Sequence, residues 1–323
     1  MCFVCGIGRV GSVWSVPSGQ VSLTKQFPEG DGVSWEPLKQ SLAGFDNIVS
    51  NLGVRIGADA PVAAQLALVR QFLADHAALP EKELFAKWPK EQFREFHDAA
   101  IVVRRLTESV VALGDQPAGS LRQRLKRVLS GPLTQDFSPQ QAKDHFYELE
   151  IATIFKKAGF TVALREPDVV VSGNGLGGEL GMACKYPSSD AQIHQHLSKG
   201  YRQLANQNMD DCVVIGLDII VFRAAFDSTP KFLDFRQGER HPLDVANTLV
   251  GDAMKALVVQ RARDYPSERA IDGAILTLSM FGFWGRPAGL TSVTAWAVQC
   301  DAQNARFRDI GRLVEAGRQG TMK

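Results

Sequence analysis

The stretch SPQQAKDHFYELEIATIFKKAGFTVALREPDVVVSGNGLGGELGMACKYPSSDAQIHQHLSKGYRQLANQ, residues 138–207, decides the fold. Ser138 is a typical N-cap, Pro139 suits the first turn of a helix, and Gly159 is a typical helix end. The runs after Gly159 are short, rich in β-branched residues and separated by turn residues, which favours strands. The predicted order is helix, three strands, helix and strand, at residues 138–158, 160–164, 169–171, 180–186, 187–204 and 212–222.

Few charged residues interrupt the apolar parts of this stretch. Glu148 lies on the first predicted helix, Asp168 follows Pro167 at a strand edge, and Lys185 lies near the end of a later strand. Because side chains alternate along a strand, Ala183 and Lys185 share one face. Each residue alone has a structural explanation, so their joint order carries the prediction. Two carboxylates and a lysine from separate elements suit Mg²⁺, which prefers oxygen ligands, and an ammonium beside it can orient a water molecule.

The layout resembles the PD-(D/E)XK phosphodiesterase superfamily, which has the restriction-endonuclease-like fold. Its pattern is a glutamate on the first core helix, a proline-aspartate pair on a strand and an acid-x-lysine motif on the next strand. Several branches add a helix that carries a glutamine. The matching positions in this chain are, in order, Glu148, Pro167-Asp168, Ala183-Cys184-Lys185 and Gln203.

The resemblance implies roles for these residues. Asp168 and Glu148 would hold or orient Mg²⁺ or Mn²⁺, helped by the main-chain carbonyl of Cys184. Lys185 would assist the attacking water, and Gln203 would belong to the catalytic set. The implied fold is α/β, with a restriction-endonuclease-like mixed central sheet flanked by helices and preceded by an N-terminal helical domain.

One position departs from the pattern, because the acid of the acid-x-lysine motif is replaced by Ala183. Three explanations are open. Another acid supplies the ligand, and Glu148, Glu150 or Asp190 suits this better than Glu179, which is roughly 13 Å away along the strand. Alternatively, the site is degenerate and serves binding only. The third explanation is that alanine here inactivates an otherwise active protein.

The composition is that of an ordinary globular protein, and 323 residues are enough for two domains. Lys and Arg number 36 against 35 acids, so any surface for nucleic acid must be a local patch. Five scattered cysteines favour a reducing compartment. With no long apolar stretch or leader-like segment, these features predict a cytoplasmic protein without membrane association.

The N-terminal part shows two weak motifs before its helices. Residues 6–11 match G-x-G-x-x-G, but the proline-broken run behind them is β-like, which argues against dinucleotide binding. Cys2-x-x-Cys5 has no second pair nearby, which argues against zinc. Helices are predicted at residues 36–52, 61–77, 90–113 and 118–129.

The last of these helices carries a basic cluster, Arg122, Arg124, Lys126 and Arg127. Such a cluster is either a solvated helix face or a contact for a phosphate backbone. The turn-rich segment before Ser138 predicts an N-terminal arm and helical domain at 1–133 and a nuclease-like domain at 134–323. The helical domain would select the substrate, a partner protein or a second copy of the chain.

After the deciding stretch, the pattern predicts further elements of the second domain. They are a helix at residues 243–263, two strands that extend the sheet at 274–283 and 291–299, and a last helix at 301–316. The leading function is metal-dependent hydrolysis of a nucleic-acid phosphodiester, DNA rather than RNA, and the resemblance suggests bacterial restriction or phage defence. The alternative is a catalytically inactive nuclease-like fold that binds nucleic acid or protein.

Overall fold

The computed structural model describes residues 13–14, 35–133, 141–187, 190–205, 211–218, 233–234, 248, 251–252, 273–284, 289–300 and 306–320. The chain forms two compact units, one of Gly30–Thr153 and one of Met1–Glu29 with Ile154–Lys323. The change from one unit to the other lies inside helix α6 (Gln141–Lys157). The predicted domain boundary at 133/134 borders residues 134–140, which lie outside the described part, and it stays a prediction.

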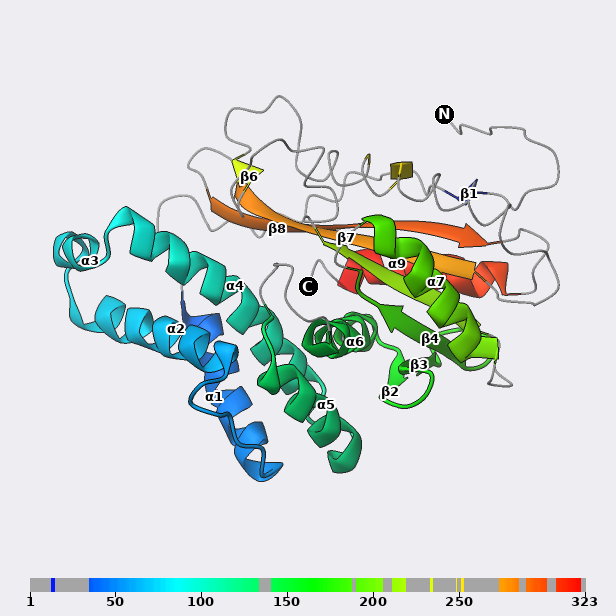
Figure 1. The fold of residues 1–323 in the computed structure, drawn as a ribbon, viewed down its shortest axis with the longest axis horizontal. Coiled ribbons are helices and arrows are strands. Elements are labelled where there is room, and N and C mark those ends of the chain that lie inside the picture. Colours follow the sequence, from blue (N-terminus) through cyan, green and yellow to red (C-terminus); the bar gives the residue numbers. More distant parts are fainter. Residues whose placement is uncertain are drawn as a thin grey trace. The chain divides into compact units, whose positions relative to one another are not determined.

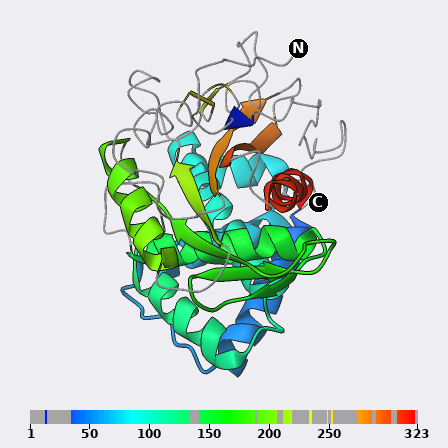
Figure 2. The ribbon, with the colours of Figure 1, turned by 90° about the vertical axis from the view of Figure 1, so that its right-hand side faces the viewer.

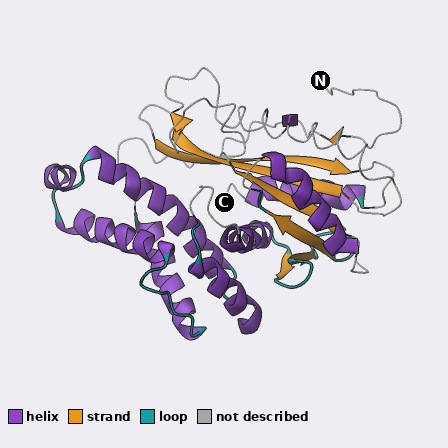
Figure 3. Cartoon of the chain, in the orientation of Figure 1, coloured by secondary structure: helices purple, strands orange, loops and turns teal. Residues whose placement is uncertain are grey.

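The described part of the unit Gly30–Thr153 is helical (Figure 3). All four predicted helices are confirmed to within one residue at each end. An additional seven-residue helix lies between Pro80 and Pro89, and it is too short for a periodicity argument to detect. Before α6, the helices are α1 (Glu36–Asn51), α2 (Pro61–Ala78), α3 (Glu81–Lys87), α4 (Lys90–Ala112) and α5 (Ala118–Ser130).

Aromatic side chains form the core between α2, α3 and α4. The rings of Phe72 and Phe96 stack with centroids 3.7 Å apart, and Trp88 meets Phe72 edge to face at 5.2 Å. All three are buried. Aromatic pairs in these geometries add to the stabilisation that burial of their area provides. Phe96 therefore lies on the face of α4 that packs into the core.

The second unit is built on a sheet that has eight strands in its described part (Figure 1). The strand order is β1-β8-β7-β5-β4-β3-β2, with β6 pairing with β7 off this path. The strands are β1 (Val13–Trp14), β2 (Thr161–Ala163), β3 (Val169–Ser172), β4 (Leu180–Lys185), β5 (Asp211–Asp218), β6 (Leu233–Asp234), β7 (Gly273–Trp284) and β8 (Gly289–Cys300).

The sheet is mixed, which confirms the predicted α/β class with a mixed central sheet. β2, β3 and β4 form an antiparallel run, whereas β4, β5 and β7 are parallel to one another. A parallel pair needs a crossover connection. Between β4 and β5 this connection contains helix α7 (Asp190–Ala205). Its position in the chain agrees with the predicted order of helix, three strands, helix and strand.

Helices cover both faces of this sheet. α7 packs against β4 and β5, and α9 (Phe307–Gly320) packs against β8. Figure 2 shows the two helices on opposite sides of the strands. The central strand β4 accordingly reads as a nearly continuous apolar run, and five of its six residues are buried.

A turn separates β3 from β4, as the turn residues between the predicted strands indicate, and α9 holds it in place. Gly173, Asn174 and Gly175 have φ values of +77°, +50° and +81°, a region that glycine and asparagine tolerate best. Arg312 donates a hydrogen bond to the carbonyl of Gly175, and the Asp309 carboxylate accepts one from the Gly177 amide at 3.2 Å. A contact between residues so distant in sequence is not visible in the local pattern.

Gly317 allows α9 to approach β8, and we expect Gly317→Ala to destabilise the protein. An added Cβ would lie 2.8 Å from the indole of Trp296, which is buried. Overpacking typically costs about 1–3 kcal/mol, which exceeds the helix-propensity gain of about 1 kcal/mol. Gly311→Ala on the same helix is the matched control, because its Cβ meets no atom within 4 Å and should raise stability. Urea unfolding of both variants tests this, and equal stabilisation of the two would contradict it.

Several predicted segments fall wholly or mostly outside the described residues: the glycine-rich segment 6–11, the strand end at 219–222 and the helix at 243–263. The two predicted C-terminal strands are confirmed as β7 and β8. The last helix begins at Phe307, later than predicted. In the part of the chain that the structure covers, no helix is both long and apolar enough to cross a membrane.

Candidate functional site

Asp168 lies directly before β3, beside the end of β4. The antiparallel register pairs Val169 with Met182, so Asp168 lies opposite Ala183. The Cys184 amide donates a hydrogen bond to Oδ2 of Asp168 at 2.8 Å. The strand pairing therefore places this carboxylate beside the acid-x-lysine position of the next strand.

Lys185 is the last residue of β4 and binds Asp168. Its Nζ donates to Oδ2 of Asp168 at 3.0 Å and to the Cys184 carbonyl at 2.9 Å. Both side chains are only 15% exposed. A lysine that is buried to this extent needs an anionic partner, and Asp168 is that partner.

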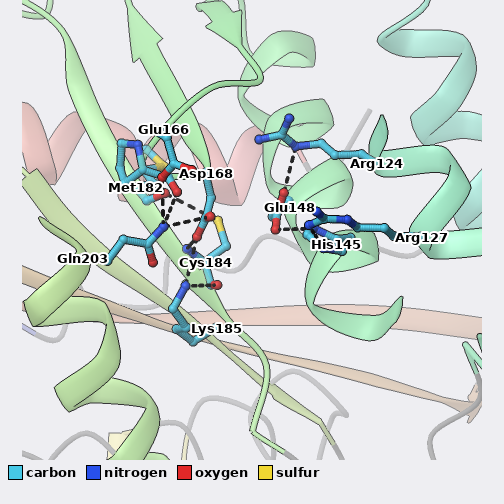
Figure 4. Close-up of polar contacts among 11 residues, drawn as sticks. Arg124, Arg127, His145, Glu148, Glu166, Asp168, Met182, Cys184, Lys185 and Gln203 are labelled. Atoms are coloured by element: carbon cyan, nitrogen blue, oxygen red, sulfur yellow. Dashed lines mark hydrogen bonds and ion pairs between the residues drawn. The ribbon is translucent and has the colours of Figure 1, made fainter. Parts of the chain in front are cut away.

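Gln203 reaches the same carboxylate from α7 (Figure 4). Its Nε2 donates to Oδ1 of Asp168 at 3.0 Å, to the Pro167 carbonyl and to Oε2 of Glu166 at 3.4 Å. Gly200 lies one turn earlier on α7, where a Cβ would be 3.0 Å from Cγ1 of Val213 in β5. The missing side chain at Gly200 allows α7 to lie close to the sheet, which brings Gln203 within reach of Asp168.

The structure thus brings together three of the four predicted catalytic side chains and the predicted carbonyl ligand. These are Asp168, Lys185, Gln203 and the main chain of Cys184. Their geometry agrees with the predicted convergence, and their roles in metal binding and catalysis stay predictions.

Glu148, the fourth predicted residue, is buried in the helical unit (Figure 4). Its carboxylate accepts a hydrogen bond from Nε of Arg124 at 2.8 Å and bonds to Nδ1 of His145 at 2.7 Å. Nη1 of Arg127 lies 2.9 Å from Nε2 of the same histidine. Because a guanidinium only donates, Nε2 accepts this bond and Nδ1 donates to Glu148. The expected meeting of Glu148 with Asp168 stays a prediction, because the two residues belong to different units.

Opposing effects set the pKa of Glu148. Burial by itself would raise it, but the hydrogen bond from His145 and the positive charge of Arg124 outweigh burial and hold the pKa below its ordinary value. The carboxylate is therefore ionised at neutral pH. Arg124 does not lie on a solvated helix face, as one explanation of the basic cluster predicted, because its side chain is mostly buried against Glu148. Arg122 and Lys126 are exposed.

The other candidate acids are paired with arginines or lie outside the described side chains. Arg105 binds both carboxylate oxygens of Glu150, and Arg165 binds Glu179 at 2.6 Å. The side chain of Asp190 is not among those described. Glu166 was not among the predicted site residues, although its position two residues before Asp168, in the Glu-Pro-Asp tripeptide, places it near the site in sequence. Its carboxylate is exposed and contacts Gln203.

His196 lies on the face of α7 that carries Gln203, two turns earlier. It is 5% exposed, and its Nδ1 has no hydrogen-bond partner among the residues that the structure describes. Burial lowers the pKa of His196 to about 4, and the positive charges of Lys199 and Lys185 act in the same direction. His196 is therefore neutral at physiological pH and adds no charge beside Lys185.

The oxygen atoms around Asp168 are of the type that Mg²⁺ prefers. They are the Asp168 and Glu166 carboxylates and the carbonyls of Pro167 and Cys184. No group of three His, Cys, Asp or Glu side chains that could hold a metal ion is found in the described part of the chain. The donor set therefore fits a hard cation that retains several water ligands.

Comparisons of the chain with protein-family models, with curated proteins and with solved structures found no match.

Proposed function

We propose that this protein is a metal-dependent nuclease of the PD-(D/E)XK type that hydrolyses phosphodiester bonds, with DNA as the preferred substrate. One observation carries the proposal: the Asp168 carboxylate is held between Nζ of Lys185 and Nε2 of Gln203. The order of elements around it supports a restriction-endonuclease-like core. Because the chain resembles this superfamily, we extend the proposal to a role in bacterial restriction or phage defence.

The proposed chemistry divides among few groups. Asp168 and the Cys184 carbonyl would hold Mg²⁺ or Mn²⁺, which when bound would polarise a phosphoryl oxygen and acidify a water molecule. Lys185 would orient the attacking water and meet the negative charge of the phosphate. The water oxygen would bond to phosphorus and release a proton to solvent, while the bond from phosphorus to the ester oxygen would break and the departing oxygen would take up a proton from solvent.

The helical unit would contribute substrate or partner binding. Arg122 and Lys126 are exposed one turn apart on α5, so their charges lie on one face of the helix. Two adjacent cations can contact a phosphate backbone, which suits an otherwise nearly neutral protein. A partner protein or a second copy of the chain would use the same unit.

A second candidate function is a nuclease-like module that binds nucleic acid without cleaving it. The observation that favours it is Ala183, which is fully buried opposite Asp168, where a second acid is expected. Lys185 also satisfies both the Asp168 carboxylate and the Cys184 carbonyl by hydrogen bonding. A site that has lost one acid and is closed by an ammonium could persist for structural reasons alone.

Cleavage assays separate the two candidates. Purified protein is incubated with plasmid DNA, single-stranded DNA and RNA in Mg²⁺, in Mn²⁺ and in EDTA. We expect cleavage of DNA only with the metal ions, and loss of cleavage in Asp168→Asn. Glu179→Gln is the matched control, since it removes an exposed carboxylate of the same unit that is paired with Arg165. Cleavage in EDTA or by Asp168→Asn would contradict the nuclease proposal, and binding without cleavage would favour the second candidate.

A further inference from the structure

We propose that Glu166 is the second carboxylate of the Asp168 site and fills the place that Ala183 leaves vacant. This inference rests on the proposed metal-dependent function. It differs from the family pattern, in which the second acid belongs to the strand that carries the lysine. In this chain the acid lies two residues before Asp168, on the other side of Pro167.

A single amide brings the two carboxylates together. Nε2 of Gln203 lies 3.0 Å from Oδ1 of Asp168 and 3.4 Å from Oε2 of Glu166, and it also binds the Pro167 carbonyl. An amide nitrogen has two hydrogens, so three acceptors around it exceed its capacity. The contact from Nε2 of Gln203 to Glu166 is the longest of the three, so Glu166 receives the weakest hydrogen bond. A cation would satisfy the surplus of oxygen atoms.

The charges in the cluster also favour a cation. Lys185 pairs with Oδ2 of Asp168, which leaves Oδ1 on the side of Gln203 and Glu166. Among the described residues, Glu166 pairs with no arginine or lysine. Glu166, Asp168 and Lys185 together therefore carry a net negative charge. Two carboxylates that share a single compensating lysine repel each other, and a bound metal ion would relieve this repulsion.

Three of the other four acids considered for the vacancy differ from Glu166 in this respect, and the side chain of the fourth, Asp190, is not among those described. Arginines neutralise three of them, through the pairs Arg124–Glu148, Arg105–Glu150 and Arg165–Glu179. Recruiting one of these acids would break its ion pair with an arginine. Glu166 is exposed, touches the amide that holds Asp168, and forms no ion pair with the residues that the structure describes.

Mn²⁺ binding to the full chain tests the proposal independently of cleavage. Isothermal titration with MnCl₂ compares the wild type with Glu166→Gln, Asp168→Asn and the control Glu179→Gln. We expect Glu166→Gln to weaken Mn²⁺ binding by roughly 10- to 100-fold, the range found when supporting groups of metal sites are removed. Glu179→Gln should bind as the wild type does, although it removes the same charge. Glu166→Asp, which withdraws the carboxylate by one methylene, should fall between the wild type and Glu166→Gln.

The contrary outcomes are distinct. If Asp168→Asn loses Mn²⁺ binding and Glu166→Gln retains it, the inference about Glu166 is wrong and the proposed function stands. If Glu166→Gln and Glu179→Gln weaken binding equally, overall charge is responsible and the inference is wrong. If the wild type binds no Mn²⁺, both the inference and the metal-dependent function are wrong. Circular dichroism of each variant checks that it is folded, which the exposure of Glu166 leads us to expect.

Discussion

Lys185→Met is expected to lower the rate of DNA cleavage by at least about 100-fold, a rise of about 2.7 kcal/mol in the activation barrier. The substitution keeps most of the apolar stem but removes the ammonium that contacts Asp168 and the Cys184 carbonyl. Its charge would stabilise the phosphate in the transition state, where the negative charge develops. Single-turnover cleavage with saturating Mg²⁺ measures this step.

A measurement of metal binding distinguishes the loss of cleavage in Lys185→Met from structural damage to the site. Methionine at 185 removes a positive charge beside Asp168, so affinity for Mn²⁺ should be retained or increased while cleavage is lost. Lys199→Met is the matched control, because Lys199 is exposed on α7 and the change in charge is the same. We expect its cleavage rate to stay within about threefold of the wild type, in line with the small worth of exposed charges. Wild-type cleavage by Lys185→Met would show that another site performs the chemistry.

Arg124→Met is expected to lower the free energy of unfolding of the helical unit by about 3 kcal/mol or more. Removing one partner of a buried ion pair leaves the other charge buried without compensation, which typically costs about 3–5 kcal/mol. Here the remaining charge is Glu148, and among the described residues only His145 would stay as its hydrogen-bond partner. Natural domains are stable by only about 5–15 kcal/mol, so a large part of the stability would be lost. Urea unfolding followed by circular dichroism measures the change.

Two further variants test whether loss of the Arg124–Glu148 ion pair causes the expected drop in the free energy of unfolding. Arg122→Met removes an exposed arginine from the same helix and should change stability by no more than about 0.5 kcal/mol. The double variant Arg124→Met with Glu148→Leu removes both charges and should recover much of the loss, since apolar replacement of a whole buried pair is often neutral. If Arg124→Met is as mild as Arg122→Met, the pair contributes little to stability.

The ion pair that Glu148 forms with Arg124 argues against its predicted role as a metal ligand. Each carboxylate oxygen of Glu148 already has a hydrogen-bond partner, Arg124 for one and His145 for the other. In the described part of the chain, Glu166 contacts the Gln203 amide but no arginine or histidine, which is why we place the second carboxylate of the site there. The Mn²⁺ titration with Glu166→Gln and the unfolding of Arg124→Met therefore test two separate functions for the two glutamates.

Most elements followed from local chemistry. Proline at the start of α1 and α2, glycine at the end of α6 and the Gly-Asn-Gly turn each restrict the backbone within a few residues. The seven-residue α3 escaped detection because a short helix offers too little periodicity. The Asp168–Lys185 contact was also predictable, since a proline-aspartate before one strand and a lysine on the next become neighbours once the strands pair.

The sequence by itself therefore determined the order of helices and strands and the core of the candidate site, because both depend on backbone preferences and on pairing between consecutive strands. Only the tertiary structure decided which charges meet across separate elements. Arg124 binds Glu148 from another helix, and Gln203 reaches Glu166 and Asp168 because Gly200 lets α7 lie close to the sheet. Such contacts depend on how helices pack, and packing is set by the shapes of many side chains together rather than by any local pattern.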